Sequence, residues 1–483
     1  MNERSSGAEL AAILRGELNR YSPGEKLPSS RALMVRHQVS PVTVSRAIAE
    51  LAAQGLVVTR PGAGVFRAEA APGAAPGGSG GTAPPDTSWQ EVALSAEAGV
   101  PPSRSADASG VLAALALAPP EVVDLNSGYL HPVLQPERAL AAALARAGRR
   151  PGAWGRPPID GLPELRAWFA RDIGGALTAS DVLITAGGQS ALTTALRSLA
   201  APGAPVLVES PTYPGTVAVA RAAGLRPVPV PVDADGLRTD LLADAFAATR
   251  ARVLVCQPLF QNPTGAVLSA ARRPEVLRIA RAAGAFVVED DFARRLVHTD
   301  APALPVPLAA EDPDGVVVHI RSLTKPTSPS LRVGAITARG PAYQRLRAVQ
   351  AMDSFFVPRP LQETTLELVA SPAWSHHLRT LAGALHDRRQ TLAVALRQWL
   401  PDLLPDRLPY GGYHLWLRLP DGRDDGALAA AALRAGVAVT PGRGYFTAEA
   451  PGPHLRLSYA CADSPERLTE GVRRLHRAYG EPL

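Results

Sequence analysis

The chain has 483 residues, of which 46% are hydrophobic and 19% are charged, and its formal net charge is +6 at pH 7. This length exceeds what one hydrophobic core usually supports, and the modest positive charge permits binding to nucleic acid without proving it. No apolar run reaches the length of a membrane span, the polar first six residues do not resemble a secretion signal, and two cysteines make no disulfide framework. We therefore expect a cytoplasmic protein of several domains, with no membrane segment.

Two short helices joined by a tight turn are predicted near the N-terminus. Ser29 or Ser30 is well placed to cap the first helix. Ser40 caps the second, Pro41 takes the first helical position, where its missing N–H costs nothing, and Gly55 can end the helix. Apolar residues recur on one face of this helix at Val44, Ile48 and Leu51. This pattern is typical of a helix-turn-helix unit.

A predicted β-hairpin follows, with strands at residues 56–60 and 65–67. Gly62 and Gly64 lie in its turn, where glycine allows close approach to another backbone. A small helical cap with a β-ribbon is the structural alternative to a DNA-binding domain. After residue 68 the composition changes to alanine, glycine and proline, which predicts a flexible linker over residues 70–108.

Residues 8–68 resemble the winged helix-turn-helix of GntR-type regulators, whose Leu-Pro-Ser-x-Arg and Ser-x-x-Thr-Val segments occur here almost intact. The resemblance implies that DNA is contacted by four side chains, Arg31, Ser40, Thr43 and Arg46, and that Gly62 and Gly64 shape the wing. Pro41 stands where many members carry a DNA-contacting arginine, which implies a shifted or weaker base preference.

Two segments in the middle of the chain favour the binding of a phosphorylated, aromatic ligand. Gly188 and Gln189 lie between the apolar run 182–184 and a predicted helix, where free backbone N–H groups suit an anion. Tyr213 is flanked by prolines that stiffen its loop, so its ring can serve as a flat stacking surface. A packed tyrosine in a proline-rich turn is the alternative interpretation of the second segment.

Two further segments place polar side chains after apolar strands. Asn262 follows the strand 253–256 in a turn, where its amide can donate to a phenolate oxygen. Asp290 ends the apolar strand that begins at residue 286. A carboxylate at the carboxyl end of a parallel strand lies where α/β sheets bind ligands, and it can pair with a pyridinium nitrogen.

Lys325 is the most informative residue, because Ser322 and Arg332 accompany it in one short segment. A lysine that bonds to an aldehyde cofactor needs a desolvated pocket, and a phosphate on that cofactor needs hydroxyl and guanidinium donors. Pyridoxal phosphate combines both demands. A surface-loop lysine is the alternative for an isolated Lys, but the upstream segments supply the rest of the site in order.

Residues from about 120 to 483 resemble the fold type I aminotransferases, and the resemblance implies a role for each of these residues. Lys325 is the cofactor-bonding and catalytic lysine, Asp290 the partner of the pyridine nitrogen, Asn262 the donor to the ring hydroxyl oxygen and Tyr213 the stacking ring. Phosphate is gripped by Gly188, Gln189, Ser322 and Arg332. Arg456 holds a substrate carboxylate. No metal site is expected.

Two positions depart from the aminotransferase pattern. Phe292 stands where the family usually has a tyrosine after the aspartate segment, and a phenyl ring cannot hydrogen-bond to the ring oxygen. Trp154, rather than a tyrosine, precedes the Gly-x-x-x-Leu-Arg segment that begins at Gly161. The loss of phenolic hydroxyls is compatible with cofactor binding and implies weak or vestigial turnover.

Together the two halves resemble the MocR subgroup of GntR-type regulators, in which a winged helix is fused to an aminotransferase-like domain. We predict a winged helix-turn-helix at residues 1–69, an α/β pyridoxal-phosphate domain at 109–370 and a smaller C-terminal α+β domain at 371–483. The predicted function is a transcriptional regulator that binds double-stranded DNA as a head-to-tail homodimer and responds to the cofactor or to an amine or amino acid. The alternatives are a working aminotransferase with a DNA-binding appendage and a sensor of pyridoxal phosphate itself.

Overall fold

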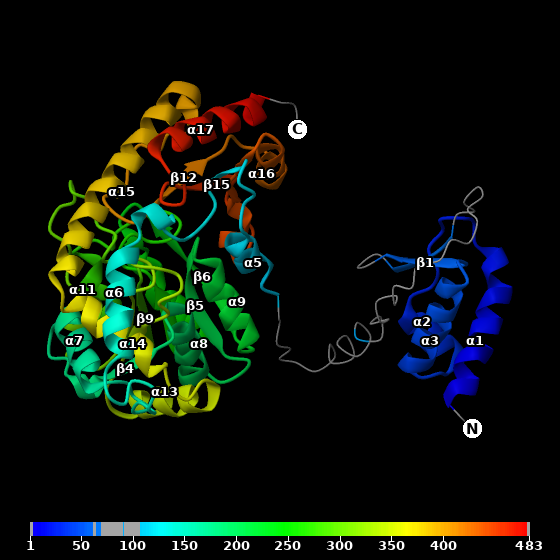
Figure 1. The fold of residues 1–483 in the computed structure, drawn as a ribbon, viewed down its shortest axis with the longest axis horizontal. Coiled ribbons are helices and arrows are strands. Elements are labelled where there is room, and N and C mark those ends of the chain that lie inside the picture. The colour runs from blue at the N-terminus through cyan, green and yellow to red at the C-terminus, as the bar shows by residue number, and fades with distance from the viewer. Residues whose placement is uncertain (1–2, 61–63, 69–89, 91–106, 481–483) are drawn as a thin grey trace. The chain divides into compact units, whose positions relative to one another are not determined.

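A computed structural model describes residues 3–60, 64–68, 90 and 107–480 (Figure 1). The contacts within the chain divide it into two compact units, Met1–Ser103 and Arg104–Leu483. Each unit has its own hydrophobic core. The units are described separately below.

In the described part of the N-terminal unit, three α-helices are followed by a two-stranded hairpin. Its elements are α1 (Glu3–Glu17), α2 (Ser30–His37), α3 (Pro41–Ala53), β1 (Val57–Arg60) and β2 (Gly64–Arg67). The Ser29 hydroxyl accepts a hydrogen bond from the N–H of Ala32 at 3.2 Å, so Ser29 rather than Ser30 caps α2. Ser40 caps α3 in the same way, through the N–H of Thr43 at 3.2 Å.

The core of this unit joins all three helices to the hairpin. Its buried members include Leu10, Leu14, Leu33, Val44, Ile48, Leu51 and Val57. The predicted apolar face of α3 is thus the face that packs against α1 and α2. In the hairpin β1 pairs antiparallel with β2, and Gly64 has a φ of +110°, a conformation that residues with a Cβ rarely adopt. Gly62 lies outside the described residues.

The second unit is built on one eight-stranded sheet. Its strands, in spatial order, are β4 (Val182–Thr185), β11 (Gly334–Thr337), β10 (Val317–Ser322), β9 (Phe286–Asp291), β8 (Val253–Cys256), β5 (Pro205–Ser210), β6 (Arg226–Asp233) and β7 (Gly236–Leu237). Strands β6, β5, β8, β9 and β10 are parallel, whereas β11 runs antiparallel to both of its neighbours. The carboxyl ends of five strands therefore meet at one edge of the sheet.

Helices cover both faces of this sheet. The helices are α6 (Glu137–Gly148), α7 (Pro163–Ile173), α8 (Gly188–Leu199), α9 (Pro214–Ala222), α10 (Thr239–Thr249), α11 (Arg272–Ala282), α12 (Leu308–Glu311), α13 (Gly340–Asp353) and α14 (Arg359–Val369). In β5, Val206 and Val208 pack with α8, α9 and α13, while Leu207 between them packs with α10 and α11. Because both faces are buried, the strands read as continuous apolar runs rather than alternating ones.

The last part of the chain adds a second, smaller sheet with its own helices. Strands β12 (His414–Arg418), β15 (His454–Ser458) and β14 (Thr440–Pro441) pair antiparallel. The long helix α15 (Pro372–Trp399) and the helices α16 (Asp425–Arg434) and α17 (Pro465–Gly480), coloured from yellow to red in Figure 1, belong to the same part of the unit, where α16 contacts β14 and β15 and α15 packs on α17. A short strand early in the unit, β3 (Val123–Asp124), pairs parallel with β13 (Val437–Ala438) and so joins the start of the unit to its end.

A helix that sequence patterns did not predict follows directly after the predicted linker. Helix α5 (Ser109–Leu115) lies a few residues before β3 and contacts α9. Most of the predicted linker, residues 70–108, falls outside the described residues. The division of the second unit at residue 370 stays a prediction. Among the described helices, none is both long and apolar enough to cross a membrane.

We predict that the two units fold independently. A fragment of residues 104–483 should keep the thermal unfolding transition that the full chain shows for this unit, because the core residues on both faces of its sheet come from within it. Differential scanning calorimetry of the fragment and of the full chain measures this directly. A fragment that unfolds more than a few degrees below its counterpart in the full chain would contradict the independence of the two units.

Candidate functional site

A pocket of about 390 Å³ opens at the carboxyl edge of the parallel strands. This volume lies in the range of small-molecule sites, and this edge is where α/β sheets place ligands. The pocket is lined by Gly110, Val111, Leu115, Gly128, Tyr129, Gly188, Gln189, Leu192, Tyr213, Pro214, Gln257, Asn262, Asp290, Phe292, Ser322, Thr324, Lys325, Pro329, Arg332, Tyr413, Tyr445 and Arg456. All nine residues predicted for the cofactor and the substrate are therefore gathered in one place, although their individual roles stay predictions.

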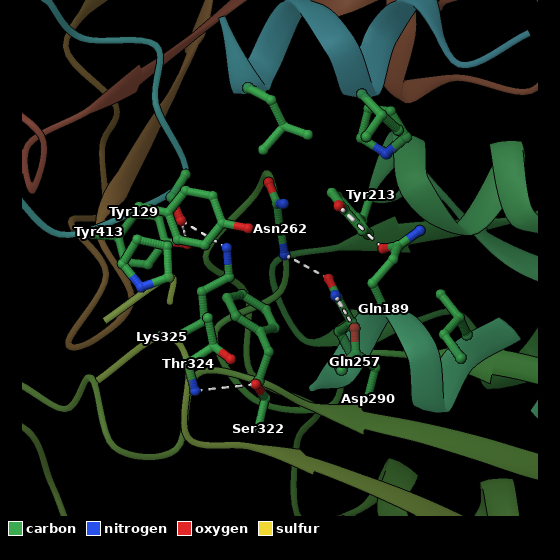
Figure 2. A pocket seen from close by; sticks show the side chains of 18 of the residues that line it. Tyr129, Gln189, Tyr213, Gln257, Asn262, Asp290, Ser322, Thr324, Lys325 and Tyr413 are labelled. Atoms are coloured by element: carbon green, nitrogen blue, oxygen red, sulfur yellow. Dashed lines mark hydrogen bonds between the residues drawn. The ribbon is translucent and has the colours of Figure 1, made fainter. Parts of the chain in front are cut away.

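Lys325 lies inside the pocket with its amine held by a backbone carbonyl (Figure 2). Its Nζ donates a hydrogen bond to the carbonyl of Gly128 at 2.7 Å and lies 4.0 Å from the centre of the Tyr129 ring. The hydroxyl of Tyr413 donates to the same carbonyl at 2.5 Å. Burial, with a smaller contribution from the nearby Arg456, lowers the pKa of Lys325 to about 7. At neutral pH a large fraction of this amine is thus uncharged and nucleophilic.

Asp290 is the last residue but one of β9, and its side chain lies in the pocket (Figure 2). Burial raises the pKa of this carboxyl to about 6, and a hydrogen bond from Gln257 Nε2 at 2.7 Å opposes the rise. Asp290 is therefore mostly ionised at neutral pH and can pair with a protonated ring nitrogen.

Gln257 is a site residue that sequence reasoning missed. Its Nε2 donates to Asp290, while its Oε1 accepts the backbone N–H of Asn262 at 3.0 Å. One buried side chain thus fixes the positions of two predicted cofactor partners. The available signal was a polar residue directly after the apolar strand β8, at the edge where ligands bind.

Glu209 lies behind Gln257 at the end of β5. Its Oε2 accepts hydrogen bonds from the backbone N–H of Gln257 at 3.1 Å and from Gln261 Nε2 at 3.2 Å. Burial raises the pKa of the Glu209 carboxyl to about 8, despite these two donors. At neutral pH most of this carboxyl carries a proton.

The end of the pocket at helix α8 has the features of an anion cradle. Gly187, with a φ of +86°, precedes the helix, and a side chain there would place its Cβ 3.2 Å from the Arg332 guanidinium and from Thr324 Oγ1. Arg332 lines the pocket, and its Nη2 donates to the carbonyl of Ala186 at 2.7 Å. The buried hydroxyl of Thr324 has no partner among the described residues. A helix N-terminus, a guanidinium and hydroxyls suit a phosphate group, so the site fits pyridoxal phosphate.

Tyr213 forms one wall of the pocket. Its hydroxyl donates to Gln189 Oε1 at 3.3 Å, and its ring lies against Gly215, where a Cβ would come within 2.2 Å of the ring. Helix α9 begins at Pro214, directly after the tyrosine. The proline and the glycine together define the position of the ring, as a stacking surface requires.

Arg456 projects from β15 into the pocket and is only 3% exposed. Its guanidinium donates to the Asn126 carbonyl, to Thr440 Oγ1 at 3.4 Å and to Asn262 Oδ1 at 3.5 Å. Its Nε has no partner among the described residues. A buried guanidinium that has two long hydrogen bonds and an Nε–H without a partner among the described residues is suited to a carboxylate ligand.

The departures from the aminotransferase pattern lie in different places. Phe292 lines the pocket and is buried, so the site itself lacks the hydroxyl that a tyrosine would bring. Trp154 is 83% exposed and is not among the lining residues. Tyr129 and Tyr413 are lining residues that sequence reasoning missed, because no motif connects them to the other segments. Thr324 also lines the pocket and stands directly before Lys325 in the segment that the sequence singled out.

The residues predicted to contact DNA differ in exposure. The side chains of Arg31, Ser40 and Arg46 are exposed on α2 and α3 or at the turn between them. Thr43 is buried, and its Oγ1 lies 2.9 Å from the Ser40 hydroxyl. The structure thus places the Thr43 hydroxyl in the cap of α3, and the DNA-contacting roles of all these residues stay predictions.

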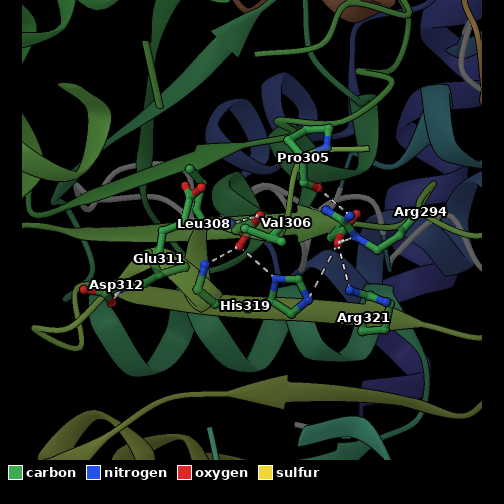
Figure 3. A network of polar contacts seen from close by, with 12 residues as sticks. Arg294, Pro305, Val306, Leu308, Glu311, Asp312, His319 and Arg321 are labelled. Carbon is green, nitrogen blue, oxygen red and sulfur yellow. Dashed lines mark hydrogen bonds and ion pairs between the residues drawn. The ribbon is translucent and has the colours of Figure 1, made fainter. Parts of the chain in front are cut away.

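A buried network of polar contacts includes His319 and Arg321 of β10 and Arg294 (Figure 3). Side chains alternate between the two faces of a strand, so Glu289 and Asp291 of β9 lie on the opposite face from Asp290. The Glu289 carboxylate accepts the N–H groups of Leu308 at 2.8 Å and Ala309 at 3.0 Å and bonds His319 Nδ1 at 2.9 Å. Asp291 accepts from Arg321 at 2.9 Å and from Arg294 at 2.5 Å. Glu289, Asp291 and His319 are close enough together to hold a metal ion, but the two guanidinium groups on Asp291 already neutralise its charge.

Comparison with known proteins adds two family matches. Residues 120–475 match the family described as aminotransferase class I and II, and residues 8–66 match the bacterial regulatory proteins of the gntR family. The HTH-type transcriptional regulator TauR of Rhodobacter capsulatus is 30% identical to this chain over 95% of the chain and 93% of TauR. The vitamin B6 salvage pathway transcriptional repressor PtsJ of Salmonella typhimurium is 30% identical over 71% of the chain and 76% of PtsJ.

Among solved structures, LysN from Thermus thermophilus is similar to the second unit. LysN is an α-aminoadipate aminotransferase whose structure contains N-(5'-phosphopyridoxyl)-L-leucine. It superposes with a TM-score of 0.71 and 31% sequence identity, over 77% of this chain and 95% of LysN.

The first prediction from this site concerns Gln257. Gln257→Leu should weaken the retention of pyridoxal phosphate by roughly tenfold, because Asp290 loses its donor and the N–H of Asn262 is left buried without an acceptor. Equilibrium dialysis of the cofactor against wild type and variant measures the loss. Gln261→Leu is the matched control, since Gln261 bonds Glu209 and Pro211 but neither of the two cofactor partners. Equal losses in both variants would contradict a specific role for Gln257.

The second prediction concerns Glu209 and pH. Between pH 4.5 and 8 the folded protein keeps the proton of Glu209 while the unfolded chain loses it, so this residue lowers stability as the pH rises. Glu209→Gln removes this dependence. In cofactor-free protein, the melting temperature of the variant minus that of wild type should therefore be several degrees greater at pH 8 than at pH 5. Parallel curves of melting temperature against pH would contradict the protonated state of Glu209.

Proposed function

Because the chain belongs to the aminotransferase class I and II family and carries a gntR-family winged helix-turn-helix at its N-terminus, we propose that it regulates transcription. This combination of domains is that of a MocR-type regulator. The chain binds DNA through the N-terminal unit and holds pyridoxal phosphate at Lys325. The family matches confirm the predicted family and the predicted combination of a GntR-type helix-turn-helix with an aminotransferase fold, and the smaller C-terminal domain stays a prediction. The signal is the cofactor or an amine or amino acid that binds beside it.

One observation carries the proposal: a complete pocket for pyridoxal phosphate and an exposed pair of arginines on a helix-turn-helix occur in the same chain. When bound, the cofactor supplies an aldehyde that reacts with amines and a ring that withdraws electrons. TauR and PtsJ, which match this chain over 93% and 76% of their own length, are both named as transcriptional regulators.

The chain's own residues supply binding and orientation. Burial keeps much of the Lys325 amine uncharged near pH 7 by lowering its pKa, and the carbonyl of Gly128 positions it. Asp290, oriented by Gln257, stabilises a positive charge on the cofactor ring. The phosphate is held by Gly188, Gln189, Ser322 and Arg332, the ring is covered by Tyr213, and Asn262 faces its hydroxyl oxygen. Arg456 holds the carboxylate of an amino acid.

A working aminotransferase with a DNA-binding appendage is the less favoured alternative. Phe292 brings no hydroxyl to the site, so the tuning of the cofactor's ring oxygen that a tyrosine would give is absent. Rapid turnover needs stabilisation of the transition state, whereas sensing needs only binding. The site is therefore better suited to binding amines than to converting them.

The partners follow from this function. A regulator that recognises a repeated or two-fold DNA site is commonly a dimer, and we propose a head-to-tail homodimer in which the aminotransferase-like units pair. The chain then brings two winged helices to the operator. Its place is the cytoplasm, where bacterial DNA is.

The test of this function is a paired assay on one preparation. A gel shift with the DNA upstream of the chain's own gene should show specific binding, and conversion of common keto acids over many protein equivalents should be slow or undetectable. Lys325→Ala should lose the visible absorption of the bound cofactor and the response of DNA binding to amines. Rapid conversion without a specific DNA shift would overturn the regulator in favour of the aminotransferase.

The DNA-binding surface is tested by Arg46→Ala. If Arg46 reads a base edge, the variant should lose about 1 to 3 kcal/mol of binding free energy, and if it contacts only phosphate, the salt dependence should decrease by about one contact. Arg226→Ala is the control, because Arg226 is exposed in the other unit. Unchanged affinity and salt slope in Arg46→Ala would show that α3 is oriented differently on DNA.

A further inference from the structure

The charges that line the pocket are few, and each has a partner in the proposed function. Among the described lining residues the charged side chains are Asp290, Lys325, Arg332 and Arg456. The cofactor occupies the first three through its ring nitrogen, its aldehyde and its phosphate. Arg456 takes a carboxylate on the α-carbon. No charged side chain of the described pocket is then left for a charge at the far end of a ligand.

The remaining wall is apolar and comes largely from α5. Gly110, Val111 and Leu115 of this helix line the pocket together with Leu192 and Pro214. The helix packs closely on α9, since a Cβ on Gly110 would lie 3.5 Å from the Pro214 side chain. Leu115 is nevertheless 50% exposed at the pocket wall, so it has apolar surface that a ligand can cover.

A single residue connects this wall to the carboxylate-binding arginine. Asn126 accepts a hydrogen bond from Arg456 at its backbone carbonyl and from Thr440 at its Oδ1, and its Nδ2 donates to the carbonyl of Ala113 in α5 at 3.0 Å. Asn126 thus fixes the separation between Arg456 and the apolar face of α5. A ligand that reaches from one to the other must have a carboxylate and an apolar group.

We propose that the effector is an α-amino acid with an uncharged, apolar side chain, whose carboxylate binds Arg456 and whose side chain lies against Val111 and Leu115 of α5. This inference rests on the proposed function, because it assigns Arg456 and the cofactor-binding residues as above. An aliphatic side chain gains free energy by leaving water at this wall. A side-chain carboxylate or ammonium must lose its hydration there without a partner, which is unfavourable.

The test is a titration of full-length protein reconstituted with pyridoxal phosphate, followed by the visible absorption of the bound cofactor. L-leucine and L-norvaline should reach half-saturation at concentrations roughly tenfold or more below those of L-glutamate, L-2-aminoadipate and L-lysine. Isoamylamine, which is leucine without its carboxylate, should bind more weakly than leucine because it cannot pair with Arg456. Tighter binding of glutamate or 2-aminoadipate than of leucine would overturn the inference.

Variants of α5 test the wall itself. Leu115→Arg should reverse the preference toward L-glutamate, because it brings a guanidinium to the end of the ligand side chain. Leu112→Arg is the matched control, since Leu112 lies on the same helix, is 64% exposed and is not among the lining residues. An unchanged preference in Leu115→Arg, or the same change in both variants, would show that α5 does not select the ligand.

A gel shift on the same samples separates this inference from the proposed function. If leucine changes the absorption with the expected preference but leaves the affinity for the operator unchanged, the inference about the ligand stands and the regulatory function fails. If operator binding responds to pyridoxal phosphate while no amino acid changes the absorption, the regulator stands and the inference fails.

Discussion

The parallel pairing of β5, β8, β9 and β10 is the constraint on which the site depends. It places the ends of four strands at one edge, so that Glu209, Gln257, Asp290 and Ser322 come together although up to 113 positions separate them in the chain. The hydrogen bond between Gln257 and Asp290 exists only because β8 and β9 are adjacent and in this register. The apolar residues between these polar ends bury both faces of the sheet and keep the register unique.

Desolvation at this edge gives the site its reactivity. Burial lowers the pKa of Lys325 and raises the pKa of Asp290, so both are poised near neutral pH by the same physical cause acting on groups of opposite charge. The guanidinium of Arg456 adds to the effect on the lysine and prepares a place for a carboxylate. On the opposite face of the sheet, the ion pairs of Asp291 with Arg321 and Arg294 hold the end of β9 in place behind Asp290.

The pocket is completed by segments from the far ends of the second unit. The pairing of β3 with β13 brings residues just after α5 beside the last sheet, so Asn126, Gly128 and Tyr129 reach a site whose other walls come from the middle of the chain. Tyr413 enters from the segment before β12 and shares the Gly128 carbonyl with Lys325. Lys325 and residues of α5 therefore line the same pocket. Among the described helices of this unit, α5 lies nearest in sequence to the N-terminal unit.

Local residue chemistry was sufficient to predict the helix caps, the apolar strands, the two-part organisation and the ligand class, because each depends on neighbours in sequence. Ser40 followed by Pro41 can start a helix in isolation, and a lysine among hydroxyls and an arginine indicates an aldehyde and a phosphate without a fold. The roles of Gln257, Asn126 and Tyr413 could not be predicted in this way, since each depends on a partner far away in the chain. The burial of Thr43 and the apolar wall of α5 are likewise decided by packing between helices. Tertiary structure alone brings these groups within bonding distance and removes the water that would otherwise keep Lys325 charged.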